Sequence, residues 1–128
     1  MKDFRKLQIW VRSHGIALDV YRITQSFPKA EIYGIVRQMR RLASSIPTNI
    51  AEGSGRKTEK DFAGFLDNAI RFASEQEYQL LLAHDLNYLP SNAYKTTNDE
   101  LIQIKRMLNT CIQKLRTKTQ KQPIKANR

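Results

Sequence analysis

The stretch RQMRRLASSIPTNIAEGSGR, residues 37–56, decides how this chain folds. Apolar residues recur within and just before it at spacings of three and four, at Ile32, Ile35, Val36, Met39, Leu42, Ala43, Ile46 and Ile50. This period predicts an amphipathic helix, and the period passes unbroken through Pro47. An internal proline removes one backbone hydrogen bond and crowds the carbonyl four residues back. We therefore predict one helix that is kinked at Pro47 and ends near Gly53, where Gly53-Ser54-Gly55 offers a residue for the left-handed conformation.

The remaining sequence predicts three more helices, over residues 9–27, 58–88 and 94–115. Phe27-Pro28 ends the first, because a residue before proline is pushed out of the helical region. Lys29-Ala30-Glu31 then opens the helix that contains Pro47. Thr58-Glu59-Lys60-Asp61 resembles a capping box and starts the longest helix. No segment has the alternating pattern of a strand.

Short connections between amphipathic helices favour antiparallel neighbours. We predict an all-α protein, an antiparallel up-down four-helix bundle formed by residues 1–118. Beyond Thr117 the apolar spacing stops, and Gln122-Pro123 is unfavourable to helix. Residues 119–128 are therefore expected to be a basic, disordered tail.

Positive charge is concentrated at the C-terminal end of a chain whose net charge is +10. Residues 1–104 carry 14 Lys or Arg against 12 Asp or Glu, whereas residues 105–128 carry eight Lys or Arg and no acid. A basic end of this kind attracts polyanions, nucleic acid first. The same charges also suit a solubilising tail and a helix C-terminus.

Catalytic, metal and cofactor sites are not predicted. Neither His14 nor His84 lies three residues after a glutamate, so the motif of di-iron bundles is absent. One cysteine and two histidines give no zinc-ligand spacing, and Cys111 falls at a core position. No apolar run suits a membrane span and the first residues lack a signal-peptide pattern, so we expect a non-enzymatic cytoplasmic protein.

Arg37, Arg40 and Arg41 are the strongest binding candidates, since spacings of three and four place them on one ridge of a helix. A phosphate backbone would relieve the repulsion between these like charges. The alternative is that carboxylates of the third helix pair with them, and Asp67, Glu75 and Glu77 are available.

Further candidate nucleic-acid contacts are Arg56, Lys57, Lys114, Arg116, Lys118 and Lys121. Tyrosines at positions 33, 78, 88 and 94 either stack on bases or pack at the ends of the bundle. Pro47, Asn49, Glu52 and Gly53 are interpreted as a structural motif. In it, Asn49 bonds a carbonyl near the kink and Glu52 accepts from an arginine of a neighbouring helix or subunit.

The same residues resemble the four helix bundle proteins related to the product of 23S ribosomal RNA intervening sequences, the S23 ribosomal protein-like family. The resemblance covers about residues 4–115. It is carried by Phe4-Arg5-Lys6-Leu7 with Trp10, Phe27-Pro28, Glu31-x-Tyr33-Gly34, Gln38-x-Arg40-Arg41, Ser45-Ile46-Pro47-x-Asn49-Ile50-Ala51-Glu52-Gly53-x-Gly55-Arg56, Phe65-Leu66, Glu75-x-Glu77 and Asp85-Leu86-x-Tyr88-Leu89. The chain departs from the family at Arg71-Phe72, where a small Gly-Ser pair is usual.

This resemblance implies a homopentamer that associates with nucleic acid, because the distant relatives include the basic accessory protein of diversity-generating retroelements, which binds nucleic acid and a reverse transcriptase. We expect an oligomeric protein that binds RNA or DNA mainly through phosphates. The alternative is a homo-oligomeric protein-interaction scaffold with a solubilising basic tail. Apolar residues on more than one face also favour self-association, namely Trp10, Val11, Leu18, Ile70, Leu81 and Met107.

Overall fold

The computed structural model describes the backbone of residues 3–126 and the side chains of residues 3–118. Four long helices account for most of this part of the chain: α1 (Gln8–Ile23), α2 (Ile35–Ser54), α3 (Glu59–Asp85) and α4 (Ser91–Ala126). Short 3-10 turns, η1 (Phe4–Lys6), η2 (Thr24–Ser26) and η3 (Lys29–Glu31), lie before α1 and between α1 and α2. The described residues contain no strand, as the sequence predicts.

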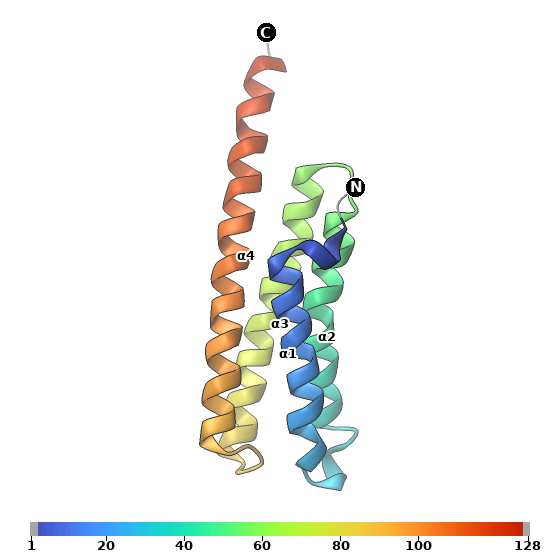
Figure 1. Ribbon diagram of the computed structural model, residues 1–128, viewed down its shortest axis with the longest axis vertical. Coiled ribbons are helices and arrows are strands. Elements are labelled where there is room, and N and C mark those ends of the chain that lie inside the picture. The colour runs from blue at the N-terminus through green and yellow to red at the C-terminus, as the bar shows by residue number, and fades with distance from the viewer. Residues whose placement is uncertain (1–2, 127–128) are drawn as a thin grey trace.

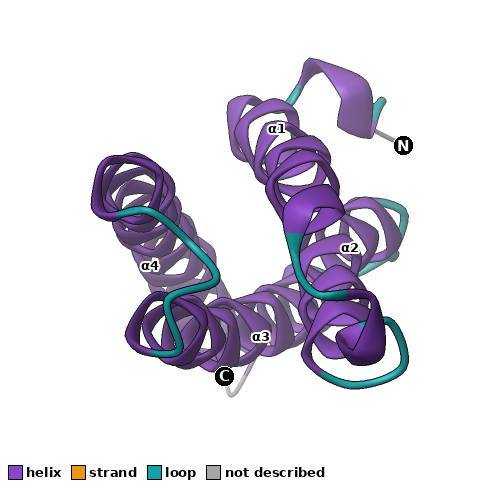
Figure 2. Ribbon diagram, turned by 90° about the horizontal axis from the view of Figure 1, so that it is seen from below, coloured by secondary structure: helices purple, strands orange, loops and turns teal. Residues whose placement is uncertain are grey.

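The helices run up and down around a common axis (Figure 1). The end-on view shows α1 across from α3 and α2 across from α4 (Figure 2). Each helix packs against its two neighbours, α2 with α3 most extensively and α1 with α4 least. The predicted all-α four-helix bundle is confirmed.

The apolar stripes of the four helices meet in one core. Its largest fully buried side chains include Ile16, Met39, Leu42, Ile46, Ile50, Leu66, Leu80, Leu101, Ile104 and Leu108. Gln76 of α3 lies in the same core with no exposed surface, and neither atom of its amide has a hydrogen-bond partner. The core is therefore apolar throughout except for a few such polar groups.

Helix α2 continues through Pro47 to Ser54, as predicted, and Pro47 is buried. Polar side chains on this helix bond to the carbonyls of the preceding turn. Ser45 Oγ donates to the Arg41 carbonyl at 2.7 Å, and Asn49 Nδ2 donates to the Ser45 carbonyl at 2.8 Å. The helix is thus continuous at the proline, and the bend itself stays a prediction.

Gly53 serves close packing rather than a left-handed turn, which corrects the expectation for Gly53-Ser54-Gly55. No glycine among the described residues has positive φ, and Gly55 closes the helix at φ −89°. A Cβ on Gly53 would lie 2.8 Å from both Phe62 Cδ1 and Phe65 Cβ of α3. A side chain at position 53 would therefore force α2 and α3 apart.

The ends of α2 and α3 differ from the predicted ones. Helix α2 begins at Ile35, because residues 29–31 form a separate 3-10 turn. Helix α3 begins as expected, with Thr58 Oγ1 accepting from the Asp61 amide at 3.1 Å. It ends at Asp85 rather than near residue 88, because Asn87 takes the left-handed conformation at φ 65°. The amides of Asn87 and Tyr88 then bond back to the carbonyls of His84 and Ala83, both at 2.9 Å.

Helix α4 is longer than the sequence predicts. It runs to Ala126 and projects beyond the other helices (Figure 1), which corrects the expectation of a non-helical segment from residue 119. Residues 116–122 are mostly Arg, Lys and Gln, which are good helix formers, so loss of apolar spacing alone does not end the helix. Pro123 falls only three residues before the helix ends.

Among the side-chain hydrogen bonds that join different elements, those of Arg12 and Tyr88 also raise a pKa. Arg12 of α1 donates to the Glu100 carboxylate of α4 through Nε, at 3.0 Å, and through Nη2. This hydrogen bonding raises the pKa of Arg12, although burial opposes the shift. The Tyr88 hydroxyl donates to Glu31 Oε2 at 2.7 Å. That hydrogen bond, aided by burial and by the carboxylate charge, raises the pKa of Tyr88 above its usual 10.0.

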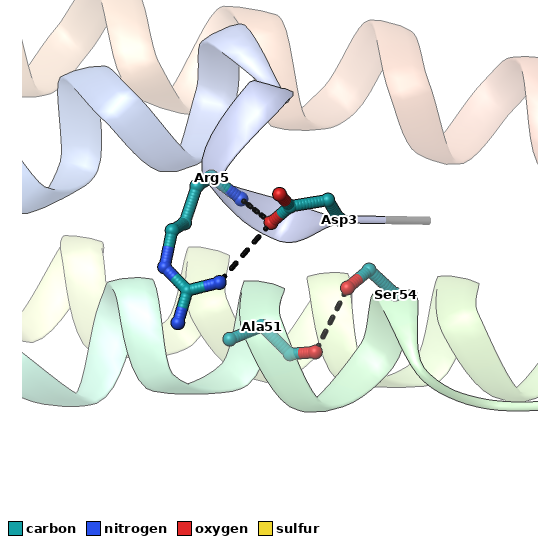
Figure 3. Close-up of polar contacts among 4 residues, drawn as sticks. All are labelled: Asp3, Arg5, Ala51 and Ser54. Atoms are coloured by element: carbon teal, nitrogen blue, oxygen red, sulfur yellow. Dashed lines mark hydrogen bonds and ion pairs between the residues drawn. The ribbon is translucent and has the colours of Figure 1, made fainter. Parts of the chain in front are cut away.

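The turn η1, the first element of the described residues, packs against α2 as well as α1. Asp3 Oδ1 accepts from the Arg5 amide at 3.1 Å and from its guanidinium at 3.3 Å, which holds turn η1 (Figure 3). The Arg5 side chain extends towards the part of α2 where Ser54 Oγ donates to the Ala51 carbonyl at 2.9 Å (Figure 3). Turn η1 thereby adds an exposed cation near this end of the bundle.

Candidate nucleic-acid interface

Arg37 and Arg41 lie four residues apart on the exposed face of α2. Within the described part of the chain, the Arg37 guanidinium has neither a hydrogen bond nor an ion pair. Arg41 Nε and Nη2 reach only Gln38 Oε1, at 3.4 and 3.3 Å, and Gln38 is uncharged. Neither charge is therefore compensated by a carboxylate of the described residues.

Arg40 plays a different part, because its side chain is half-buried against α1. Its Nε donates to Thr24 Oγ1 at 2.9 Å and its Nη2 donates to the Tyr21 carbonyl at 3.3 Å. Its guanidinium carbon also lies 4.8 Å from the centroid of the Tyr21 ring. Arg40 thus links α2 to the C-terminal end of α1, where a cation interacts favourably with the negative end of the helix dipole.

The expected alternative, pairing of these arginines with α3 carboxylates, is not what the described residues form. Asp67 instead accepts from Arg116 Nη2, and Glu77 accepts from Lys105 Nζ at 2.5 Å. Glu75 is exposed. Asp67 and Glu77 therefore pair with cations of α4 and not with the arginines of α2.

A surface hollow of about 360 Å³ lies between the end of α1 and the start of α2. It is lined by Tyr21, Ile32, Tyr33, Val36, Arg37, Arg40 and Arg41. Tyr33 is 83% exposed and Tyr21 is 46% exposed, so both rings are accessible. The arrangement combines cations with aromatic faces.

The sequence does not predict Tyr21 and Ile32 as neighbours of the arginines. Tyr33 is a predicted candidate, and its spacing of four from Arg37 is a usable signal. Tyr21 had no such signal, because it lies in another helix and reaches the hollow only through the packing of α1 on α2.

Two of the four candidates on α4 are compensated by acids of α3. Arg116 pairs with Asp67, and Lys118 Nζ lies 2.9 Å from Glu59 Oε1. Lys114 is exposed. The side chain of Lys121 lies outside the described residues. The α3–α4 seam, defined here by Asp67, Glu59, Arg116 and Lys118, is therefore a set of ion pairs rather than a free cationic surface.

The connection between α2 and α3 holds the other two candidates. Arg56 and Lys57 are both exposed there. The guanidinium carbon of Arg56 lies 4.7 Å from the centroid of the Phe65 ring, which orients it across the start of α3. These two cations lie at the opposite end of α2 from Arg37.

Glu52 is exposed and its carboxylate has no hydrogen bond with another described residue, so the described residues do not meet the interpretation that it accepts from an arginine of a neighbouring helix. It lies at the edge of an apolar hollow of about 480 Å³ between α1 and α2. Trp10, His14, Leu18 and Pro47 line this hollow, and the rings of Trp10 and His14 stack with centroids 4.8 Å apart.

The described residues contain no group of three or more metal-ligating side chains. Among their helices, none combines the length and the apolar character needed to cross a membrane.

Comparison with known proteins places the chain in a family. Its fold is similar to that of a protein of unknown function from the S23 ribosomal protein family of Bacteroides thetaiotaomicron, whose crystal structure has a resolution of 1.70 Å. The TM-score is 0.74 and the identity 24%, over 81% of this chain and 97% of that one. No curated protein matches the chain. Residues 5–110 match the sequence profile of the 23S rRNA-intervening sequence proteins, and the chain therefore belongs to that family.

Proposed function

We propose that this protein is a non-enzymatic, homo-oligomeric nucleic-acid-associated protein that binds RNA or DNA mainly through phosphates. One observation carries the proposal. Arg37 and Arg41 are exposed on one helix face with no carboxylate of the described residues beside them, whereas Arg116 and Lys118 of α4 pair with acids of α3. Guanidinium groups donate in pairs to phosphate oxygens, so this face suits a phosphate backbone.

The family supports a connection with RNA, since its name refers to an intervening sequence of 23S rRNA. The binding surface is repeated if the chain self-associates, and the exposed side chains of Val11, Leu18 and Leu81 favour this. A pentamer follows from the resemblance to retroelement accessory proteins, and so does a reverse transcriptase as a protein partner. Light scattering tests self-association, and a mass of 14.9 kDa at micromolar concentration would exclude it.

Salt dependence tests the proposal most directly. The affinity of the full chain for a fluorescein-labelled RNA is measured by anisotropy across a range of salt concentrations. Phosphate contacts make log K fall with log salt by nearly one unit for each neutralised phosphate. We expect a steep slope of log K against log salt, one that corresponds to more than two neutralised phosphates per chain. A flat slope, or no binding at low salt, would contradict the proposal.

The second candidate function is a protein-interaction scaffold, which the apolar hollow beside Trp10 and Leu18 favours. An interface of this kind depends only weakly on salt. Capture of partners from lysate with and without nuclease separates the two functions. Partners of a scaffold survive nuclease, whereas those bridged by nucleic acid are lost.

A further inference from the structure

We propose that the hollow between α1 and α2 binds unpaired nucleotides, with a base on Tyr33 or Tyr21 and the adjoining phosphates on Arg37 and Arg41. The inference rests on the proposed function and deepens it, because it selects single-stranded over duplex nucleic acid. The hollow measures about 360 Å³, and both tyrosines and all three α2 arginines line it.

Tyr33 is the first observation. Its side chain is 83% exposed just before α2 begins, more than any other large hydrophobic residue among those described. A tyrosine ring in water has an uncovered apolar face, and a base that stacks on it covers that face. The phenol hydroxyl remains at the edge of such a stack, so it stays hydrated.

Tyr21 is the second observation, because its position is fixed by Arg40. The guanidinium carbon of Arg40 lies 4.8 Å from the ring centroid, and its Nη2 donates to the Tyr21 carbonyl at 3.3 Å. One wall of the hollow is therefore preorganised, which lowers the entropy lost on binding. Arg37 and Arg41 are not used in this way and remain available to phosphates.

The combination discriminates between strands. In a duplex both faces of each base are already covered by its neighbours, so an aromatic side chain on the protein surface gains nothing from stacking. A single strand exposes base faces and phosphates together. Arginines alone bind both forms, whereas arginines beside exposed tyrosines favour the single strand.

The test compares two RNA probes by fluorescence anisotropy, a labelled oligouridylate and a labelled blunt-ended RNA duplex with the same number of phosphates. The full chain is used as wild type, Tyr33→Ala, Tyr33→Phe and Tyr78→Ala. Tyr78 is the matched control, since it is 58% exposed on α3 and does not line the hollow. Because every variant keeps its cations, the salt slope reports phosphate contacts independently.

We expect Tyr33→Ala to weaken oligouridylate binding about tenfold while duplex binding and the salt slope stay unchanged. Tyr33→Phe retains the affinity because it retains the ring, and Tyr78→Ala has no effect. Equal loss with both probes, no loss with either, or the same loss in Tyr78→Ala would overturn the inference. If both probes bind wild type with a steep salt slope and Tyr33→Ala binds both as tightly as wild type does, the proposed function stands and this inference falls. If neither probe binds, both fall.

Discussion

The exposed face of α2 and the α3–α4 seam carry cations of similar number, but their surroundings are opposite. On the seam, Arg116 and Lys118 pair with Asp67 and Glu59. On the α2 face, Arg37 is unpaired within the described residues and Arg41 meets only an amide oxygen. Equal charge therefore does not mean equal availability, and net charge alone does not locate a binding surface.

The largest expected effect comes from removing the α2 cations. The double variant Arg37→Gln/Arg41→Gln should weaken RNA binding about a hundredfold at about 0.1 M salt and lower the salt slope by nearly two units. Anisotropy titrations measure both. The control Lys60→Gln/Arg71→Gln removes two exposed cations from α3 and should change affinity only slightly. Equal losses in the two variants would show that only total charge matters, and the comparison would fail.

The next prediction concerns stability: a more stable protein would allow variants of the α3–α4 seam to be compared with variants of the α2 face without loss of folding. Gln76→Met replaces a fully buried amide that has no partner with an apolar side chain of similar length. An unsatisfied buried polar group costs about 1–3 kcal/mol, so the free energy of unfolding should rise by about that amount. Urea denaturation measures it. A loss of stability would mean that the amide has a partner, such as an internal water molecule.

A smaller effect should convert the seam into a surface like the α2 face. Asp67→Asn removes the carboxylate that Arg116 contacts and leaves its cation free. We expect about threefold tighter RNA binding from the released charge. Both groups of this pair are about half exposed, so the loss in unfolding free energy should be under about 1 kcal/mol. Glu75→Gln is the control, because Glu75 is exposed on the same helix and forms no ion pair with another described residue. Unchanged affinity in Asp67→Asn would indicate that the position of a cation matters more than its pairing.

The smallest effect concerns Glu31 in turn η3, which lies just before α2. The bond from Tyr88 to Glu31 stabilises the fold while Tyr88 is protonated, and it raises the pKa of Tyr88 above 10.0. This contribution is complete below the unfolded pKa and is lost as the pH rises through the folded pKa. The stability difference between wild type and Tyr88→Phe should therefore shrink above about pH 10. Urea midpoints at several pH values follow it, with Tyr78→Phe as the control. A difference that stays constant with pH would exclude this hydrogen bond as the cause.

Local sequence patterns predict most of the helices but few of the side-chain contacts between helices. The apolar period of residues 32–50 correctly predicts a helix through Pro47, because burial of one continuous face outweighs one lost hydrogen bond. Gly53 was noticed for its backbone freedom, yet its role is to admit Phe62 and Phe65, a contact between helices that no local pattern contains.

The candidate site shows the same division. The spacing of Arg37, Arg40 and Arg41 placed them on one helix, but the packing of α1 turned Arg40 into a structural contact and left the other two exposed. The arrangement of the helices around the axis decides which acids lie beside which cations. Asp67 contacts Arg116 because α3 packs against α4.

The length of α4 gives the proposed binding a range as well as a surface. Residues 119–126 extend the helix by about 12 Å at its usual rise. Ionic screening at physiological salt reduces electrostatic attraction over about 8 Å. The sequence of this extension includes Lys121 and Lys125. The extension projects beyond the end of the bundle where α2 ends, opposite the start of α2 that carries Arg37 and Arg41 (Figure 1), so in the proposed binding α4 attracts a long polyanion at an end of the bundle that the α2 face does not reach.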